Sequence, residues 1–125
     1  MSKENKAIVE EVNDAMRRGD VEAFLARCTD DFVWTIVGEA PVAGKDAVRR
    51  FMAQAPPEPP SFTVDTLIGD GDVVAAKGEM TMKDERGVAV DYAFCDVWTF
   101  RGGQLAALNA FVVKTTPKAA AAGRS

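Results

Sequence analysis

Residues 92–100, YAFCDVWTF, place one carboxylate among aromatic side chains. In a β-strand alternate residues share a face, so one face would carry Tyr92, Phe94, Asp96, Trp98 and Phe100. A carboxylate in apolar surroundings pairs with a cation, accepts several hydrogen bonds, or stays protonated with a raised pKa. A protonated carboxyl can donate a hydrogen bond to an enolate or another oxyanion. The alternative is a structural aspartate satisfied by an amide, an indole N–H or backbone groups.

The chain contains no histidine. This excludes Ser–His–Asp and Cys–His catalysis and His-ligated zinc, and it removes the usual general base near neutral pH. The sequence also lacks a P-loop and a GxGxxG segment, so we expect no nucleotide. The acidic segments at 30–31 and 84–86 fit solvated turns, so we expect no metal and no other cofactor. Any proton transfer would depend on a carboxylate, a tyrosine or a lysine with a shifted pKa.

The segment RGGQ, residues 101–104, predicts the neighbour of Asp96. Gly102-Gly103 is typical of a two-residue hairpin turn. With Arg101 and Gln104 flanking the turn, Asp96 is predicted to face Asn109, close enough for a hydrogen bond. The same register pairs Trp98 with Ala107, Phe94 with Phe111 and Tyr92 with Val113. Tyr92 lies about 13 Å along the strand from Asp96, so it would line the same cavity further along.

The preceding hairpin leaves two alternatives open. An even number of loop residues would place Lys77 and Glu79 on the face that carries Asp96. An odd number, or a bulge, would place Met80 and Met82 there and leave Lys77 and Glu79 in solvent.

The composition indicates one domain of 125 residues with a net charge of −4. That charge argues against nucleic acid as a partner. No apolar run approaches the ~20 residues that span a bilayer, and MSKENK lacks the apolar part of a signal peptide. Cys28 and Cys95 have no metal spacing, so we expect reduced thiols and a cytoplasmic protein without membrane contact.

Helices are predicted before strands along the chain. Apolar spacing indicates helices over residues 3–18, over a short segment from Asp20 through Cys28, and over 45–55, with a short strand at 32–36 between the last two. After PPEPP come four strands near 61–68, 73–83, 88–101 and 104–115, separated by glycine-containing turns. This order predicts an α+β domain over residues 1–116, in which helices cover one face of an antiparallel sheet. Residues 117–125 are predicted to form a disordered tail.

Three segments carry a resemblance to a known superfamily: RRGDVEAFLARCTDDFVWTIVG, AGKDAVRRFM and DVWTFRGGQLAALNAF. In their order and spacing they resemble the nuclear transport factor 2-like superfamily, which includes SnoaL-like polyketide cyclases, ketosteroid isomerases and limonene epoxide hydrolases. The resemblance implies a cone-shaped fold, in which a strongly curved sheet is wrapped by three N-terminal helices around an apolar pocket. It also implies a homodimer.

The resemblance carries over only some site residues. Asp96 falls where ketosteroid isomerases keep a protonated oxyanion-hole aspartate. Their general base would fall near Ile36 and their tyrosine near Val12, so neither is present. The Arg-x-Asp pair and last-strand Asp of epoxide hydrolases correspond to Lys77, Glu79 and Asn109. In cyclase-like members an acid in the pocket serves as acid and base, a role open to Asp96 or Glu79.

We therefore expect the protein to bind a small apolar or aromatic molecule, with isomerase-, cyclase- or hydrolase-like acid–base chemistry. The alternative is a non-catalytic ligand-binding or dimerisation module of the same fold. The candidate catalytic residues are Asp96, Asn109 and Glu79. The candidate substrate-binding residues are Trp34, Lys77, Tyr92, Phe94, Trp98 and Phe111.

Overall fold

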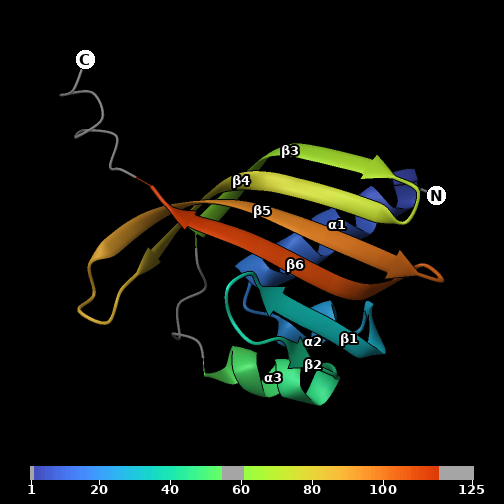
Figure 1. Cartoon of the computed structure of the whole chain (residues 1–125), viewed down its shortest axis with the longest axis horizontal. Helices are drawn as coiled ribbons and strands as arrows, with labels where there is room; N and C mark the ends of the chain where they lie inside the picture. Colours follow the sequence, from blue (N-terminus) through green and yellow to red (C-terminus); the bar gives the residue numbers. More distant parts are fainter. Residues whose placement is uncertain (1, 55–60, 116–125) are drawn as a thin grey trace.

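The computed structural model describes residues 2–54 and 61–115 (Figure 1). The linker PPEPP and the predicted tail at 117–125 lie outside these ranges. The helices are α1 (Ser2–Arg17), α2 (Val21–Leu25) and α3 (Lys45–Ala53). As predicted, Asp20 caps α2, because its Oδ1 accepts a hydrogen bond of 3.1 Å from the Ala23 N–H. The second helix ends earlier than predicted, and Cys28 already belongs to the following strand.

Six strands form a single sheet in the order β2-β1-β6-β5-β4-β3. Their bounds are β1 (Cys28–Ile36), β2 (Val42–Ala43), β3 (Ser61–Asp70), β4 (Val73–Lys83), β5 (Ala89–Arg101) and β6 (Gln104–Lys114). The four strands of the second half form the predicted antiparallel meander. The sequence did not predict that β1 joins it in parallel beside β6, which makes the sheet mixed.

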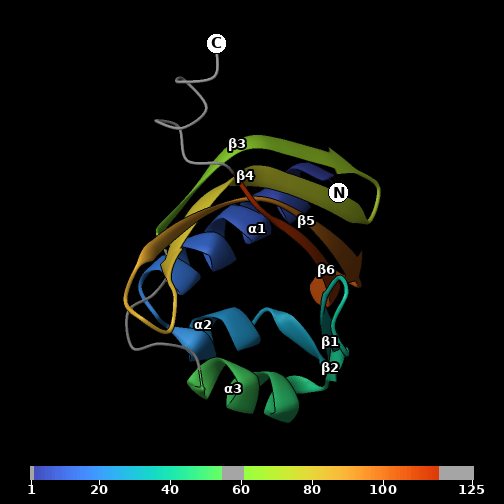
Figure 2. The same cartoon turned by 60° about the vertical axis from the view of Figure 1, so that its left-hand side comes forward.

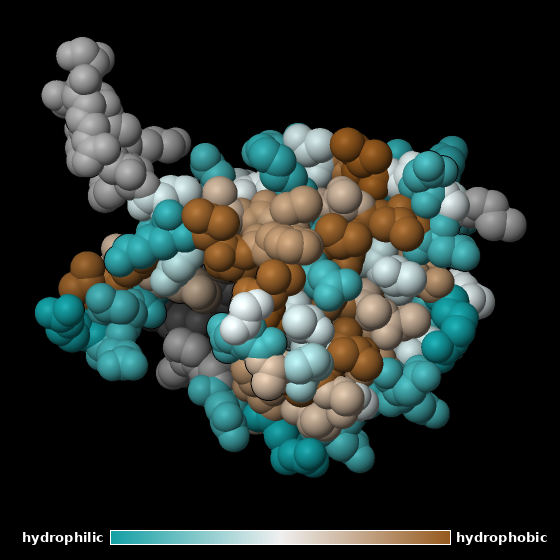
Figure 3. All heavy atoms as spheres, in the orientation of Figure 1, coloured by the Kyte–Doolittle hydropathy of each residue, from teal (hydrophilic) through white to brown (hydrophobic). Residues whose placement is uncertain are grey.

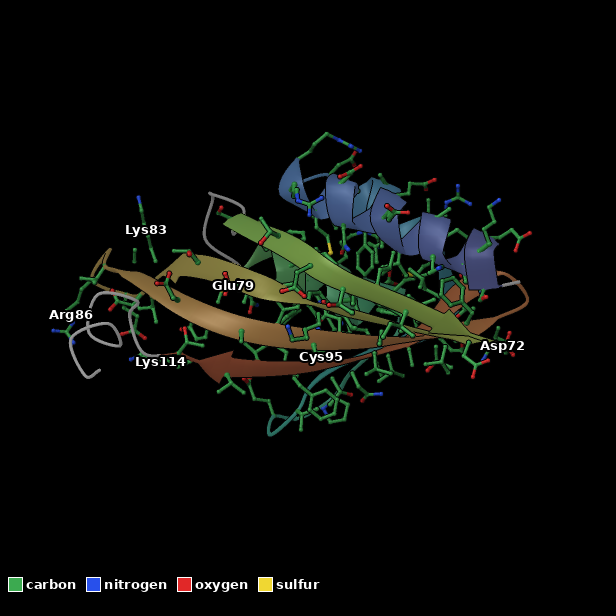
Figure 4. All side chains as sticks on the ribbon, turned by 90° about the horizontal axis from the view of Figure 1, so that it is seen from above. Asp72, Glu79, Lys83, Arg86, Cys95 and Lys114 are labelled. Carbon is green, nitrogen blue, oxygen red and sulfur yellow. The ribbon has the colours of Figure 1, made fainter. Side chains whose placement is uncertain are left out.

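The sheet curves strongly, and the helices lie on its concave side (Figure 2). Figure 4, in which the sheet is seen from above and its strands run across the picture, shows α1 on one side of the sheet only. We call the side that faces the helices the inner face, and the opposite side the outer face. The core between the inner face and the helices is aromatic and aliphatic, and its largest fully buried side chains include Trp98, Phe24, Phe32 and Leu25. The predicted α+β architecture with a curved sheet and three helices is confirmed.

The turn at Gly102-Gly103 forms as predicted, with φ angles of 59° and 80° that favour glycine. Arg101 pairs with Gln104 and Phe100 with Leu105, but Thr99 then pairs with Ala107. Ala106 is therefore an extra residue in β6, a β-bulge. Beyond it every partner differs by one residue from the predicted register, which was wrong from this point on.

The β4–β5 hairpin has five loop residues, since Lys83 pairs with Ala89. The Asp84 carboxylate holds the loop by accepting hydrogen bonds from the Arg86 and Val88 N–H groups at 2.8 and 2.9 Å. An odd loop selects the second alternative of the sequence analysis. Met80 and Met82 share the face of Asp96, and Lys77 and Glu79 lie on the outer face.

Candidate functional site

Asp96 lies on the inner face near the middle of β5. Its neighbours across the ladders are Ala76 on β4 and Ala110 on β6, two of the smallest side chains. Within the described residues the carboxyl group has no hydrogen bond and no ion pair, although it is only partly exposed. Burial raises its pKa to about 7. Asp96 thus corresponds to the third kind of carboxylate considered above, whose protonated form is populated near neutral pH.

Aromatic rings surround the row that holds Asp96. Phe94 and Trp98 flank it on β5 and are buried. The Trp98 ring packs edge-to-face on Phe24 at 6.1 Å between centroids, and Trp34 meets Phe24 at 6.2 Å. Tyr92 follows on the same face, opposite Met80 and Lys114. Four predicted binding residues, Trp34, Tyr92, Phe94 and Trp98, are therefore brought to the inner face with Asp96.

Between the inner face and the helices there are also polar side chains that have no hydrogen-bond partner among the described residues. The indole Nε1–H groups of Trp34 and Trp98 are buried and meet no acceptor among the described residues. Asn13, on α1, is only 6 % exposed, and its side chain likewise makes no hydrogen bond in the described part of the chain. Sequence analysis missed Asn13, whose signal is a polar residue beside Val9 and Val12 on the apolar stripe of the first helix. Buried polar groups are normally satisfied, so these groups are available to a ligand oxygen.

Two predicted site residues on β6 lie on the opposite side of the sheet. Asn109 pairs with Val97, not with Asp96, and its side chain is exposed on the outer face. Phe111 pairs with Cys95 and is 46 % exposed on the same face. The cause is the bulge at Ala106, because a one-residue change of register moves each later side chain to the other face.

Lys77 and Glu79 also point away from Asp96. Lys77 pairs with Cys95 across the ladder, and its ammonium group forms an exposed ion pair of 3.3 Å with Asp65. Glu79 is exposed opposite Ala93. Figure 4 marks Glu79 and Cys95 along the sheet, with Asp72 at one end and Lys83, Arg86 and Lys114 at the other. Asp96 is the only carboxylate on the inner face of the described strands.

This arrangement can donate one proton, or accept one, in an apolar environment. A carboxyl group with a pKa near 7 is matched to proton transfer at neutral pH, where both protonation states are populated. Residues 2–54 and 61–115 contain no group of three or more His, Cys, Asp or Glu side chains that could hold a metal. Nor does this part of the chain contain a helix long and apolar enough to cross a membrane.

Comparison with solved structures shows the fold. An NTF2-like protein of unknown function from Burkholderia pseudomallei K96243 matches with a TM-score of 0.81 and 24 % identity, over 88 % of this chain and 90 % of the other. An LEH-like epoxide hydrolase from M. tuberculosis matches with a TM-score of 0.79 and 17 % identity, over 89 % and 84 %. SalBIII, described as an epoxide hydrolase/cyclase-like enzyme in pyran ring formation in polyether salinomycin, matches with a TM-score of 0.80 and 23 % identity, over 88 % and 91 %.

These identities are low, so the structural matches support the fold alone. A search of curated proteins finds no match. The family model for the SnoaL-like domain matches residues 9–108, from the middle of α1 to the buried Leu108 of β6. That range contains Trp34, Phe94, Asp96 and Trp98. The chain is a member of the SnoaL-like domain family, within the NTF2-like fold.

Proposed function

We propose that the inner face binds a small apolar or aromatic molecule and that Asp96 exchanges a proton with it. The observation that carries this proposal is the partly exposed Asp96 carboxyl, which has no partner among residues 2–54 and 61–115 and lies among aromatic rings. Its pKa of about 7 is caused by burial alone, so a ligand oxygen has no competing donor or acceptor to displace. Trp34, Tyr92, Phe94 and Trp98 form the aromatic walls, and Asn13 is a further polar candidate.

Two structural neighbours are described as enzymes. The protein from M. tuberculosis is described as an LEH-like epoxide hydrolase and SalBIII as an epoxide hydrolase/cyclase-like enzyme, so the shared fold is compatible with a reaction at an oxygen-containing group. In this chain the protonated Asp96 would donate to a carbonyl, enolate or ether oxygen, and its conjugate base would take a proton back. The aromatic surroundings of Asp96 lower the local dielectric constant, which strengthens such a hydrogen bond.

A second candidate function is a ligand-binding module without turnover. This candidate is favoured by the absence of a second carboxylate from the inner face of the described strands. Asp96 would have to act as both acid and base. Proton exchange on a bound molecule distinguishes the two candidates. An enzyme would exchange protons with its ligand, whereas a binding module would only hold it.

The test uses aromatic ketones such as acetophenone, which accept hydrogen bonds but cannot donate them. Binding is followed by the fluorescence of Trp34 and Trp98 at pH 6 and pH 8.5. We expect binding at pH 6 to weaken tenfold or more in Asp96→Ala, which corresponds to about 1.4 kcal/mol. Asp96→Asn keeps a donor and should bind without the pH dependence. Glu79→Gln, an exposed carboxylate on the outer face, is the matched control and should bind like the wild type.

Turnover is tested by deuterium exchange at the carbon beside the ketone carbonyl, followed by NMR. Exchange catalysed by the wild type and lost in Asp96→Asn supports the enzyme. Saturable binding without exchange supports the binding module. If no aromatic ketone binds, or if Asp96→Ala binds the ketones as well as the wild type does, Asp96 is structural and the proposal fails.

We also propose that a second copy of the chain covers the outer face of the sheet. Apolar side chains gather over β3 to β6 in Figure 3, which views this face. The outer-face side chains Phe111, Val113 and Ile68 are 46 %, 63 % and 60 % exposed. Exposed apolar groups in one contiguous area are typical of a protein interface. We further propose a cytoplasmic location, because Cys28 and Cys95 are free thiols, which are typical of a reducing compartment.

A further inference from the structure

A hollow of about 550 Å³ lies away from Asp96, at the end of the molecule where β1 begins. Three segments distant in sequence form it: the start of β1, the first residue of α3 and the β5–β6 hairpin. Figure 1 shows these three segments at the same end of the molecule. The lining residues are Cys28, Thr29, Asp30, Asp31, Lys45, Arg101, Gly102 and Gln104. The volume is in the range of small-molecule sites.

Lys45 brings an ammonium group into this hollow that is poorly paired. Its side chain is 27 % exposed, and its nearest carboxylate, that of Asp30, lies 3.7 Å away, which is too far for a hydrogen bond. The Asp30 side chain is itself fully exposed, so water screens its charge. Within the described residues Lys45 makes no hydrogen bond, and its three N–H donors are therefore available.

Arg101, at the β5–β6 hairpin, supplies further N–H donors to the hollow. One of its N–H groups donates to Asp31 at 2.6 Å, and the Thr29 hydroxyl donates to the same carboxylate oxygen at 2.8 Å. These contacts neutralise Asp31 and orient the guanidinium group of Arg101. This group has five N–H donors, and one of them is hydrogen-bonded to Asp31. The remaining donors of Arg101 can therefore serve a ligand in the hollow.

The floor of the hollow is neutral, and one end of it is the start of α3. Cys28 is fully buried, and burial raises the pKa of its thiol to about 12, so the floor is uncharged. Gly44 precedes α3 and has no side chain to accept the first N–H groups of that helix. These groups and the helix dipole add to the attraction that Lys45 and Arg101 exert on an anion.

We propose that this hollow is a binding site for a phosphate-type oxyanion, free or as part of a larger ligand, held between Lys45 and Arg101. Each residue offers N–H donors that a tetrahedral oxyanion can accept at several oxygens. The site is separate from Asp96 and does not depend on the function proposed for the inner face.

The test compares thermal unfolding in sodium phosphate with unfolding in sodium chloride of equal ionic strength, so that general screening cancels. We expect about 20 mM phosphate to raise Tm by at least ~3 °C. Lys45→Met keeps the aliphatic stem and should lose the rise, as should Arg101→Gln. Each variant is compared with its own chloride baseline, so a change in basal stability does not affect the result. Arg49→Gln is the matched control, because it removes a cation of α3 that is paired with Glu22 and Asp46 outside the hollow.

Isothermal titration then measures affinity directly. We expect phosphate binding to weaken at least tenfold in Lys45→Met and to be unchanged in Arg49→Gln and Asp96→Ala. Equal stabilisation by phosphate and chloride would overturn the proposal, as would full retention of the effect in Lys45→Met. Equal stabilisation by acetate would overturn the assignment to tetrahedral oxyanions, because the site would then take any small carboxylate.

Discussion

Asp96 and Ala110 are paired across the β5–β6 ladder, so the carboxyl group faces a methyl group. Its partner on the other side, Ala76, is also an alanine. Neither neighbour can donate a hydrogen bond, and neither is large enough to cover the carboxyl group as a leucine or phenylalanine would. The two alanines thus leave Asp96 desolvated yet partly exposed, which is the combination that raises its pKa and keeps it accessible.

The buried carboxyl makes stability depend on pH. The folded-state pKa of Asp96 is about 7, well above that of an aspartate in the unfolded chain. Between about pH 4 and pH 7 the folded state therefore binds more protons, and stability falls as the pH rises through this range. Asp96→Asn removes the ionisation. We expect it to match the wild type within about 1 kcal/mol at pH 4.5 and to be about 2–4 kcal/mol more stable at pH 8.5.

Urea unfolding of both proteins at the two pH values checks this. An Asp96→Asn variant whose advantage is the same at pH 4.5 and pH 8.5 would contradict a raised pKa. Glu79→Gln should show no such pH-dependent gain, since that carboxylate is exposed on the outer face.

Gly78 cannot carry a side chain, because β3 approaches it too closely. An added Cβ would lie 1.9 Å from the Thr63 carbonyl oxygen and 3.0 Å from Cζ of Phe94. We expect Gly78→Ala to lower the free energy of unfolding by about 3 kcal/mol, since backbone would have to move. Gly69→Ala is the matched control, because there the nearest atoms are side-chain atoms, Cγ of Lys6 at 3.1 Å and Cβ of Ser2 at 3.2 Å, and not backbone. Denaturant unfolding should show the larger loss in Gly78→Ala, and equal losses would disprove the close approach.

The outer face can be tested by its effect on assembly. Phe111→Glu would place a charge within the proposed dimer interface, where the second copy would remove it from water. We expect light scattering to give the mass of two chains for the wild type and of one chain for the variant. Val88→Glu changes a side chain that is also exposed, 56 %, but lies in the β4–β5 loop, and it should remain dimeric. A monomeric wild type at 100 µM would exclude a stable dimer.

Cys28 should be chemically inert in the folded protein. Its side chain is fully buried and its Sγ lies 3.5 Å from the Phe24 carbonyl oxygen. Its pKa of about 12 leaves very little thiolate even at pH 9. In a Cys95→Ser background we expect no maleimide labelling of the native protein and one label per chain in urea, as measured by mass spectrometry. Rapid native labelling would show that the start of β1 opens.

The helices, the meander and the candidate acid follow from sequence because they depend on local patterns. Alternation along β5 was enough to place Phe94, Asp96 and Trp98 on one face. The partners of Asp96 were not predictable in the same way. They depend on the extra residue Ala106 and on the length of the 84–88 loop, and neither has a local signal as strong as Gly102-Gly103. The parallel pairing of β1 with β6 brings Trp34 to the inner face, and it joins segments about 70 residues apart.

The bulge at Ala106 also bears on how chains of this fold change over time. Removing that single residue would exchange the two sides of the remaining β6: Asn109 and Phe111 would turn inward beside Asp96, and Leu108 and Ala110 would turn outward. The deletion of one residue would therefore replace Ala110 by the Asn109 amide as the neighbour of Asp96 on β6. An insertion or deletion in this hairpin can therefore change several of the side chains that face the interior at once, whereas a substitution changes one.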